Sequence, residues 1–112
     1  MNFAELKKKV LRLPLKPGVY MMRDKTSAII YIGKAKALKN RVTSYFLPNI
    51  ESEKTRRMVS NIDNFDVIVT GNEFEAFVLE NALIKRYQPK YNILLKDGKI
   101  RLSMFLTCRW KN

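Results

Sequence analysis

Apolar residues recur along the chain at two different periods, and these periods predict helices and strands. Over residues 2–12 an apolar residue returns every three or four positions among lysines and an arginine, which predicts a short amphipathic helix. Residues 19–22 and 28–32 are β-branched or aromatic runs joined by a polar turn. They predict a hairpin whose second strand ends at Gly33. Residues 65–70 alternate as a third strand.

Two longer segments have the helical period and end before prolines. Residues 34–46 carry an apolar stripe and stop before Pro48, and residues 73–87 stop before Pro89. Asn72 precedes the second segment as a candidate N-cap, with glutamates in the first turn that follows.

The complete order of predicted elements is α-β-β-α-α-β-α. Residues 54–62 add a shorter helix, and residues 90–98 are expected to be extended or irregular. A chain of 112 residues has the length of one domain, and it contains no internal repeat or linker. The fold class we expect is α/β, with a small three-stranded, mainly antiparallel sheet flanked by helices.

The charge is strongly positive, with 22 lysines and arginines against 10 acidic residues and a net charge of +12. This excess favours a polyanionic partner such as nucleic acid, although a well-solvated basic surface also accounts for it. No apolar run reaches the roughly 20 residues of a membrane-spanning helix. The N-terminus lacks the apolar stretch of a secretory signal. We therefore expect a cytoplasmic protein without a membrane partner.

Cys108 is the only cysteine, and the chain has no histidine. This composition excludes an intrachain disulfide, a Cys/His zinc site and catalysis by a serine–histidine pair. Any chemistry must use tyrosine, lysine, arginine, carboxylates and a hard metal ion.

Glu80 lies in the apolar face of the predicted 73–87 helix, amid Ala76, Phe77 and Leu83. A carboxylate there costs several kcal/mol unless it is paired or binds a cation. Two roles remain open, namely an ion pair with a lysine or arginine and a metal ligand.

Lys34, Arg41 and Tyr45 are spaced by seven and four residues, which places them on one side of the predicted 34–46 helix. An ammonium, a guanidinium and a phenol in a row suit a phosphate. A solvated basic face with Tyr45 half-buried accounts for the same pattern.

Tyr20 and Tyr31 each lie beside a glycine on neighbouring predicted strands. Tyrosines in strands are more often packing residues, and a phenol with its usual pKa near 10 is a poor base. A nearby lysine, arginine or metal-bound water would lower that pKa. Together with Glu80 and Arg41, these tyrosines indicate a metal-assisted phosphoryl-transfer site without histidine.

Two short motifs, GVY at residues 18–20 and YIG at residues 31–33, resemble the signature of the GIY-YIG endonucleases. The surrounding LPLKPGVYMMRD and the distant EAFVLENALIKRYQPKYNILLKD resemble the N-terminal nuclease domain of the UvrC family. The resemblance covers residues 1–97 and includes Gly18 and Gly33 as motif residues. The tail at residues 98–112 departs from the family pattern.

The resemblance implies a set of site residues and one metal ion, Mg²⁺ or Mn²⁺. The implied catalytic residues are Tyr20, Tyr31, Lys34, Arg41, Tyr45 and Asn92, with Glu80 as the metal ligand. Lys36, Lys39 and Lys85 are predicted to bind DNA. In the implied reaction a tyrosinate, Tyr20 or Tyr31, activates the attacking water, while Arg41 and Lys34 offset phosphate charge and the metal supports the leaving oxygen.

The resemblance also implies a place in nucleotide excision repair. The expected activity is the 3′-side incision of damaged double-stranded DNA that is already loaded with UvrB. Contact with UvrB is expected to be made by UvrC segments that this chain lacks. We therefore expect a monomeric fragment that needs partner domains for turnover. Two alternatives stay open: a catalytically silent, basic nucleic-acid-binding module of the same fold, and a homing or restriction-type GIY-YIG nuclease.

Overall fold

The computed structural model describes residues 3–48, 50 and 52–97, so the predicted tail at residues 98–112 lies outside the described residues. The elements in chain order are α1 (Phe3–Leu11), β1 (Gly18–Arg23), β2 (Ile29–Ala35), α2 (Leu38–Ser44), α3 (Glu53–Ser60), β3 (Asn64–Val69), α4 (Glu73–Tyr87) and α5 (Lys90–Asp97). None of the helices in this part of the chain is long and apolar enough to cross a membrane.

The three strands form one sheet in the order β2-β1-β3, and both strand pairs are antiparallel. The central strand β1 is buried from Gly18 to Met22, because helices cover both of its faces. The expected fold class is confirmed.

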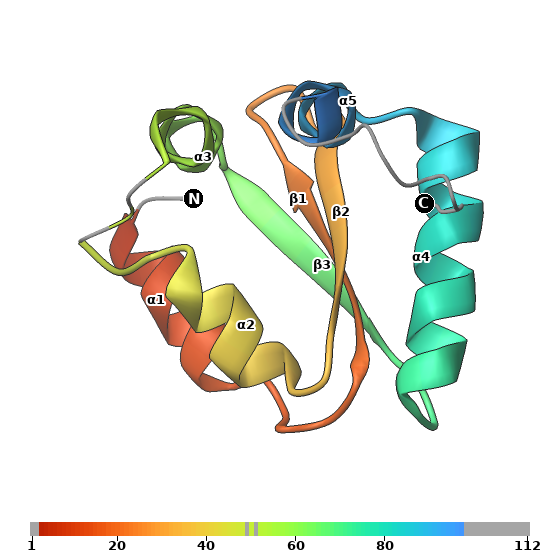
Figure 1. The fold of residues 1–112 in the computed structure, drawn as a ribbon. Helices are drawn as coiled ribbons and strands as arrows, with labels where there is room; N and C mark the ends of the chain where they lie inside the picture. Colours follow the sequence, from red (N-terminus) through yellow and green to blue (C-terminus); the bar gives the residue numbers. More distant parts are fainter. Residues whose placement is uncertain (1–2, 49, 51, 98–112) are drawn as a thin grey trace.

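Helices cover the sheet in two unequal layers (Figure 1). On one side α1, α2 and α3 contribute to a core with Tyr20, Met22 and Phe65, and on the other α4 packs Ala76 against a second core that contains Val19. Helix α5 lies across one end of the sheet, beside β2. Alternate residues of β1 therefore enter different cores, as the period of a strand requires.

The predicted helix over residues 34–46 is too long at its start. Lys34 and Ala35 belong to β2, which continues past Gly33 because Ala35 pairs with Gly18, and the helix α2 begins only at Leu38. The expectation that Lys34 shares a helix with Arg41 and Tyr45 is therefore wrong. Pairing with the buried strand β1 outweighs the helical spacing of the local sequence.

The expectation of an irregular chain over residues 90–98 is also wrong. Gln88 ends α4 in the left-handed conformation with a φ of 45°, and its backbone N–H donates to the carbonyl of Ile84. The carbonyl of Pro89 then accepts bonds from the N–H groups of Asn92 and Ile93, which starts α5. Pro89 thus separates two helices and does not end helical structure.

Lys9 shows that part of the positive charge is structural. Its ammonium donates to the side chain of Asn64 at 2.8 Å and to the carbonyl of Phe65, and it lies over the Phe65 ring. These bonds tie α1 to the start of β3.

Gly18 is required by a close approach of backbone and side chain. A Cβ atom at this position would overlap the carbonyl oxygen of Ile68 on β3 and would lie 2.7 Å from a methyl group of Leu38. The glycine therefore lets β3 and α2 both close on the start of β1.

We expect Gly18→Ala to lower the free energy of unfolding by about 1–3 kcal/mol, because the overlapped carbonyl belongs to a paired strand and cannot move freely. Denaturant unfolding measures this change. Gly71→Ala is the matched control, since the atoms nearest to its methyl group would belong to the exposed side chain of Glu75. Equal stabilities for the two variants would contradict this role of Gly18 in packing.

Candidate active site

Three tyrosines from three elements form one cluster. Tyr20 comes from β1, Tyr31 from β2 and Tyr45 from the C-cap of α2, and their ring centroids are 5.6–6.3 Å apart. The hydroxyl groups of Tyr20 and Tyr45 are hydrogen-bonded at 2.7 Å. The predicted placement of Tyr20 and Tyr31 on adjacent strands is confirmed.

Gly33 provides the space for this cluster. It is the cross-strand partner of Tyr20, and a Cβ atom at Gly33 would overlap the Tyr20 ring and hydroxyl group. The glycine of the second motif therefore lets the Tyr20 phenol lie over β2.

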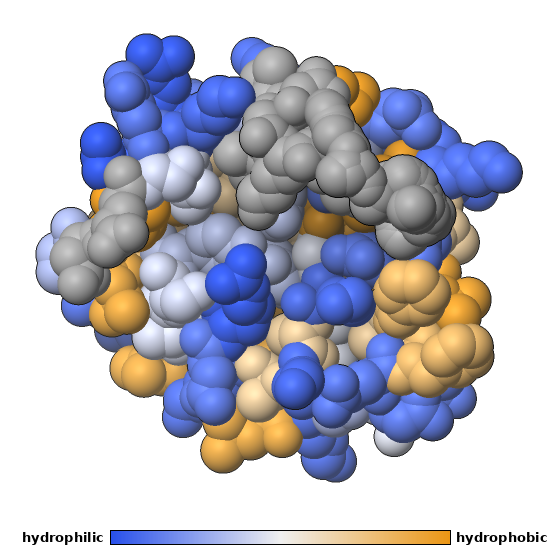
Figure 2. Space-filling view, viewed as in Figure 1, coloured by the Kyte–Doolittle hydropathy of each residue, from blue (hydrophilic) through white to orange (hydrophobic). Residues whose placement is uncertain are grey.

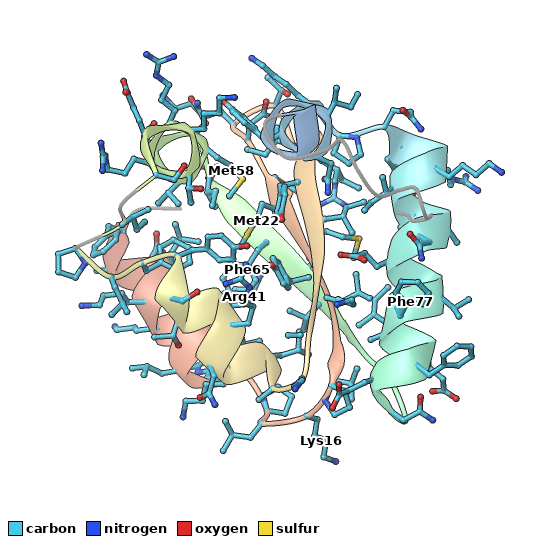
Figure 3. All side chains as sticks on the ribbon, viewed as in Figure 1. Lys16, Met22, Arg41, Met58, Phe65 and Phe77 are labelled. Atoms are coloured by element: carbon cyan, nitrogen blue, oxygen red, sulfur yellow. The ribbon has the colours of Figure 1, made fainter. Side chains whose placement is uncertain are left out.

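Arg41 joins the cluster from α2, and Figure 3 shows it between that helix and the sheet. Its guanidinium donates to the Tyr45 hydroxyl at 3.0 Å and lies 4.9 Å from the centre of the Tyr45 ring. The four-residue spacing placed these two residues together correctly. A guanidinium beside a buried phenol leaves other N–H groups to meet an anion.

The environment raises the pKa of all three phenols above the ordinary value. Burial is the largest cause for Tyr20, Tyr31 and Tyr45, and neighbouring phenols of the cluster add to it. Arg41 acts in the opposite direction on each of them but is outweighed. The expected lowering by a nearby arginine is therefore present but is smaller than the effect of burial, and the described residues hold the cluster neutral at neutral pH.

Glu80 lies partly buried on α4, and its charge contributes to the raised pKa of Tyr31. Its carboxylate therefore acts on the phenol cluster from across β2. The predicted apolar face around it is only partly correct, because Phe77 is 44% exposed while Leu83 packs against the sheet. Glu80 thus lies at the border of the packed face.

Asn92 is buried, with only 2% of its surface exposed, and its side-chain amide is hydrogen-bonded to the backbone of β2. It accepts a bond from the N–H of Ile32 at 2.7 Å and donates to the carbonyl of Ile32 at 2.8 Å. Because β2 is an edge strand, these two backbone groups have no strand partner on that side. Asn92 therefore fixes β2 between Tyr31 and Gly33.

A surface groove lies beside the cluster and includes some of the predicted cations. Lys34, Lys36 and Arg41 line it, whereas Lys39 and Lys85 are not among its lining residues. The sequence analysis did not single out Phe74 of α4, which also lines the groove. The sequence contained a signal for it: Phe74 is about 200° around the helix from the buried Ala76, so this aromatic side chain is expected on the exposed face.

The residues present fit one hard cation with few protein ligands. Among the described residues, no group of three or more histidine, cysteine, aspartate or glutamate side chains could hold a metal ion. Magnesium, however, usually keeps several waters and binds through one or two carboxylates. The Glu80 carboxylate, close enough to influence the Tyr31 phenol, satisfies that requirement.

The family of the chain follows from a comparison with family models. The model described as the UvrC-like GIY-YIG domain matches residues 16–93. The chain belongs to this family. The match contains both glycine–tyrosine motifs and extends from before β1 to α5, so it covers the three clustered tyrosines together with Arg41, Glu80 and Asn92.

Curated relatives of this GIY-YIG domain agree with that assignment. The chain is 50% identical over 104 residues to the UvrABC system protein C of Psychrobacter cryohalolentis, covering 93% of this chain and 17% of the relative. It is 56% identical over 95 residues to the protein of that name from Pseudoalteromonas translucida, covering 85% of this chain and 16% of the relative. The chain thus spans about one sixth of the length of these relatives.

Solved structures of one bacterial domain share the fold. The N-terminal GIY-YIG endonuclease domain of UvrC from Thermotoga maritima, bound to magnesium as its catalytic divalent cation, is 47% identical with a TM-score of 0.72. The similarity covers 81% of this chain and 98% of that one. An asparagine-to-alanine point mutant of that domain gives 44% identity and a TM-score of 0.73 over 90% of this chain and all of that one.

We expect Asn92→Ala to destabilise the fold, because it leaves the N–H and the carbonyl of Ile32 unpaired at a buried edge. Each such group costs roughly 1–3 kcal/mol. Denaturant unfolding gives the total, and amide hydrogen exchange should be faster at Ile32. The exposed Asn40→Ala is the control, and an Asn92→Ala variant as stable as this control would contradict the assignment.

The raised tyrosine pKa values predict a loss of stability at alkaline pH. An unfolded tyrosine ionises near pH 10, whereas the three clustered phenols stay neutral to higher pH in the folded chain. Their contribution is therefore complete below about pH 10 and is lost as the pH rises through the folded pKa values. Phenolate absorbance recorded together with circular dichroism tests this expectation. Ionisation of clustered phenols near neutral pH would refute it.

Proposed function

We propose that this GIY-YIG domain is a metal-dependent endodeoxyribonuclease that makes the 3′-side incision in nucleotide excision repair, on damaged double-stranded DNA loaded with UvrB. The observation that carries the proposal is the convergence on β2 of a buried phenol cluster, the Arg41 guanidinium and the Glu80 carboxylate. Cation, phenol and carboxylate groups in one site are those that hydrolysis of a phosphodiester requires when histidine is absent.

The comparisons support this proposal. The relatives are named as components of the UvrABC system, and the solved Thermotoga domain is an endonuclease domain with catalytic magnesium. Point mutants of that domain change three tyrosines and one asparagine, which are the residue types of Tyr20, Tyr31, Tyr45 and Asn92 in this chain.

The metal would be held by Glu80. When bound, a magnesium or manganese ion supplies positive charge that stabilises the anionic forms of phenol, water and phosphate oxygens. Arg41 is fixed by Tyr45, so its remaining N–H groups are held in place for the non-bridging oxygens of the phosphate. Lys34 lines the same groove and adds a second positive charge.

Only an ionised phenol can accept a proton from the attacking water, and Tyr31 is the tyrosine best placed to do so. A bound metal ion would supply the positive charge that offsets the burial and the Glu80 charge that raise the pKa of this phenol. Tyr20 is 1% exposed and its hydroxyl group is bonded to Tyr45, whereas Tyr31 is only partly buried and lies within the influence of Glu80. Tyr20 and Tyr45 therefore position Arg41 and the ring of Tyr31. Asn92 acts through the backbone, since both ends of its amide are bonded to Ile32.

The basic surface would hold the DNA backbone. Lys36 lines the groove, and Lys39 and Lys85 extend the positive charge over α2 and α4. Binding by phosphate contacts alone is weak and steeply dependent on salt. Contact with UvrB and with the remaining UvrC segments would therefore provide the affinity for damaged sites.

We expect Arg41→Ala and Glu80→Gln each to reduce 3′ incision by on the order of 10²–10³-fold, because each removes charge that acts where the transition state is anionic. The assay uses UvrB-loaded damaged duplex with the remaining UvrC domains supplied, and the 5′ incision should persist.

Arg57→Ala is the matched control, since Arg57 is an exposed arginine on α3 paired with Glu53. Unchanged 3′ incision in both site variants would refute the assignment. DNA binding by the native chain without nicking in magnesium or manganese, even with the partners present, would instead indicate a silent binding module.

A further inference from the structure

The groove beside the phenol cluster has two chemically different walls. It has a volume of about 660 Å³, within the roughly 300–1,000 Å³ of sites for small ligands. One wall is formed by the end of β2, the segment that follows it and helix α2, with Lys34, Lys36 and Arg41. The first turns of α4 form the other with Glu73, Phe74 and Phe77. Figure 3 shows Arg41 and Phe77 on opposite sides of β2.

The two phenylalanines are exposed without a packing role. Phe74 is 71% exposed and Phe77 is 44% exposed, and neither belongs to the two hydrophobic cores. Full burial of a phenylalanine side chain contributes roughly 1.5–3 kcal/mol, so folding gains little of this from Phe74 and only part of it from Phe77. Three residues apart on α4, they are neighbours on the helix surface and make one aromatic wall. In Figure 2 an apolar patch lies over α4, beside hydrophilic surface over β2 and α2.

The charges of the groove identify what fits it. The β2–α2 wall is cationic and suits phosphate, whereas the aromatic wall carries the carboxylate of Glu73 and so disfavours a second phosphate. A nucleotide has the matching division into an anionic phosphate and a flat, neutral base. Stacking on an aromatic side chain suits any base, because every base has a π face.

We propose that Phe74 and Phe77 form a stacking wall for one unpaired base of the strand being cut, next to the phosphate held by Arg41 and Lys34. The proposal rests on the nuclease function proposed for this domain and adds a requirement to it. The nucleotide beside the cut must leave the base stack, so a locally melted strand is the preferred substrate over a paired duplex.

Binding to two single-stranded oligonucleotides tests the stacking wall. One is oligothymidylate and the other is an abasic strand with the same number of phosphates, both labelled with a fluorophore and measured by anisotropy at low salt without a divalent metal. The native chain should bind the base-containing strand more tightly. Since stacking is worth 1–3 kcal/mol per base, Phe74→Ala with Phe77→Ala should remove a preference of roughly 5- to 150-fold while leaving abasic binding unchanged.

Matched variants separate aromatic stacking from plain apolar contact. Phe74→Tyr with Phe77→Tyr should keep the preference for the base-containing strand, and Phe74→Leu with Phe77→Leu should lose it. Val78→Ala is the control, because Val78 is an exposed apolar residue of α4, at 49%, that does not line the groove. Thermal unfolding of the alanine variants should stay close to that of the native chain, since neither phenylalanine belongs to a hydrophobic core.

Three results would overturn the proposal: equal binding of both strands by the native chain, no binding of either strand, or a double leucine variant that binds as well as the native chain. The last result would indicate that plain apolar contact, and not aromatic stacking, holds the base. These outcomes are independent of the nuclease assignment, because 3′ incision that depends on Arg41 and Glu80 can persist without base preference. Conversely, a preference for the base-containing strand without any incision would support the stacking wall and contradict the nuclease assignment.

Discussion

The arrangement of the whole domain depends on the burial of β1 on both faces and its pairing on both edges. Val19 and Met22 are completely buried and Tyr20 is 1% exposed, so no residue of this stretch can turn outward without losing core contacts. That constraint sets the register of β2 on one edge and β3 on the other. It also divides the molecule chemically, because alternate side chains point to the phenol cluster on one face and to α4 on the other.

The phenol cluster both stabilises the fold and positions the groups of the candidate active site. Its members pack as core residues, and their burial, with a smaller contribution from neighbouring phenols, keeps them neutral and so avoids buried charge. At the same time their hydroxyl groups fix Arg41 at the surface of the cluster. Asn92 does the same for the edge strand by replacing a missing neighbour strand with an amide. The site is therefore rigid where cations and phenols must be positioned, which limits reorganisation during a reaction.

The two walls of the groove match different parts of a nucleic-acid substrate. Cations at the end of β2 and on α2 match the backbone of a nucleic acid, and exposed aromatic rings on α4 match a base. The edge strand β2 contributes its end to the cationic wall and also carries Tyr31, so contacts on both walls would place one phosphate beside the phenols. Backbone and base recognition are thus supplied by elements on opposite faces of the sheet.

Local sequence determined the helices α1, α3 and α4, the three strands, the N-cap of α4 and the adjacency of Arg41 to Tyr45, because hydrophobic period, capping residues and prolines act over a few residues. It also indicated Glu80 and the tyrosine motifs as unusual positions. Tertiary structure alone decided that Lys34 lies on β2, since the pairing of Ala35 with Gly18 involves residues far apart in sequence. It alone raised the tyrosine pKa values, through burial by several elements, and bonded Asn92 to Ile32 across 60 residues. These outcomes depend on which distant groups meet, and no local period contains that information.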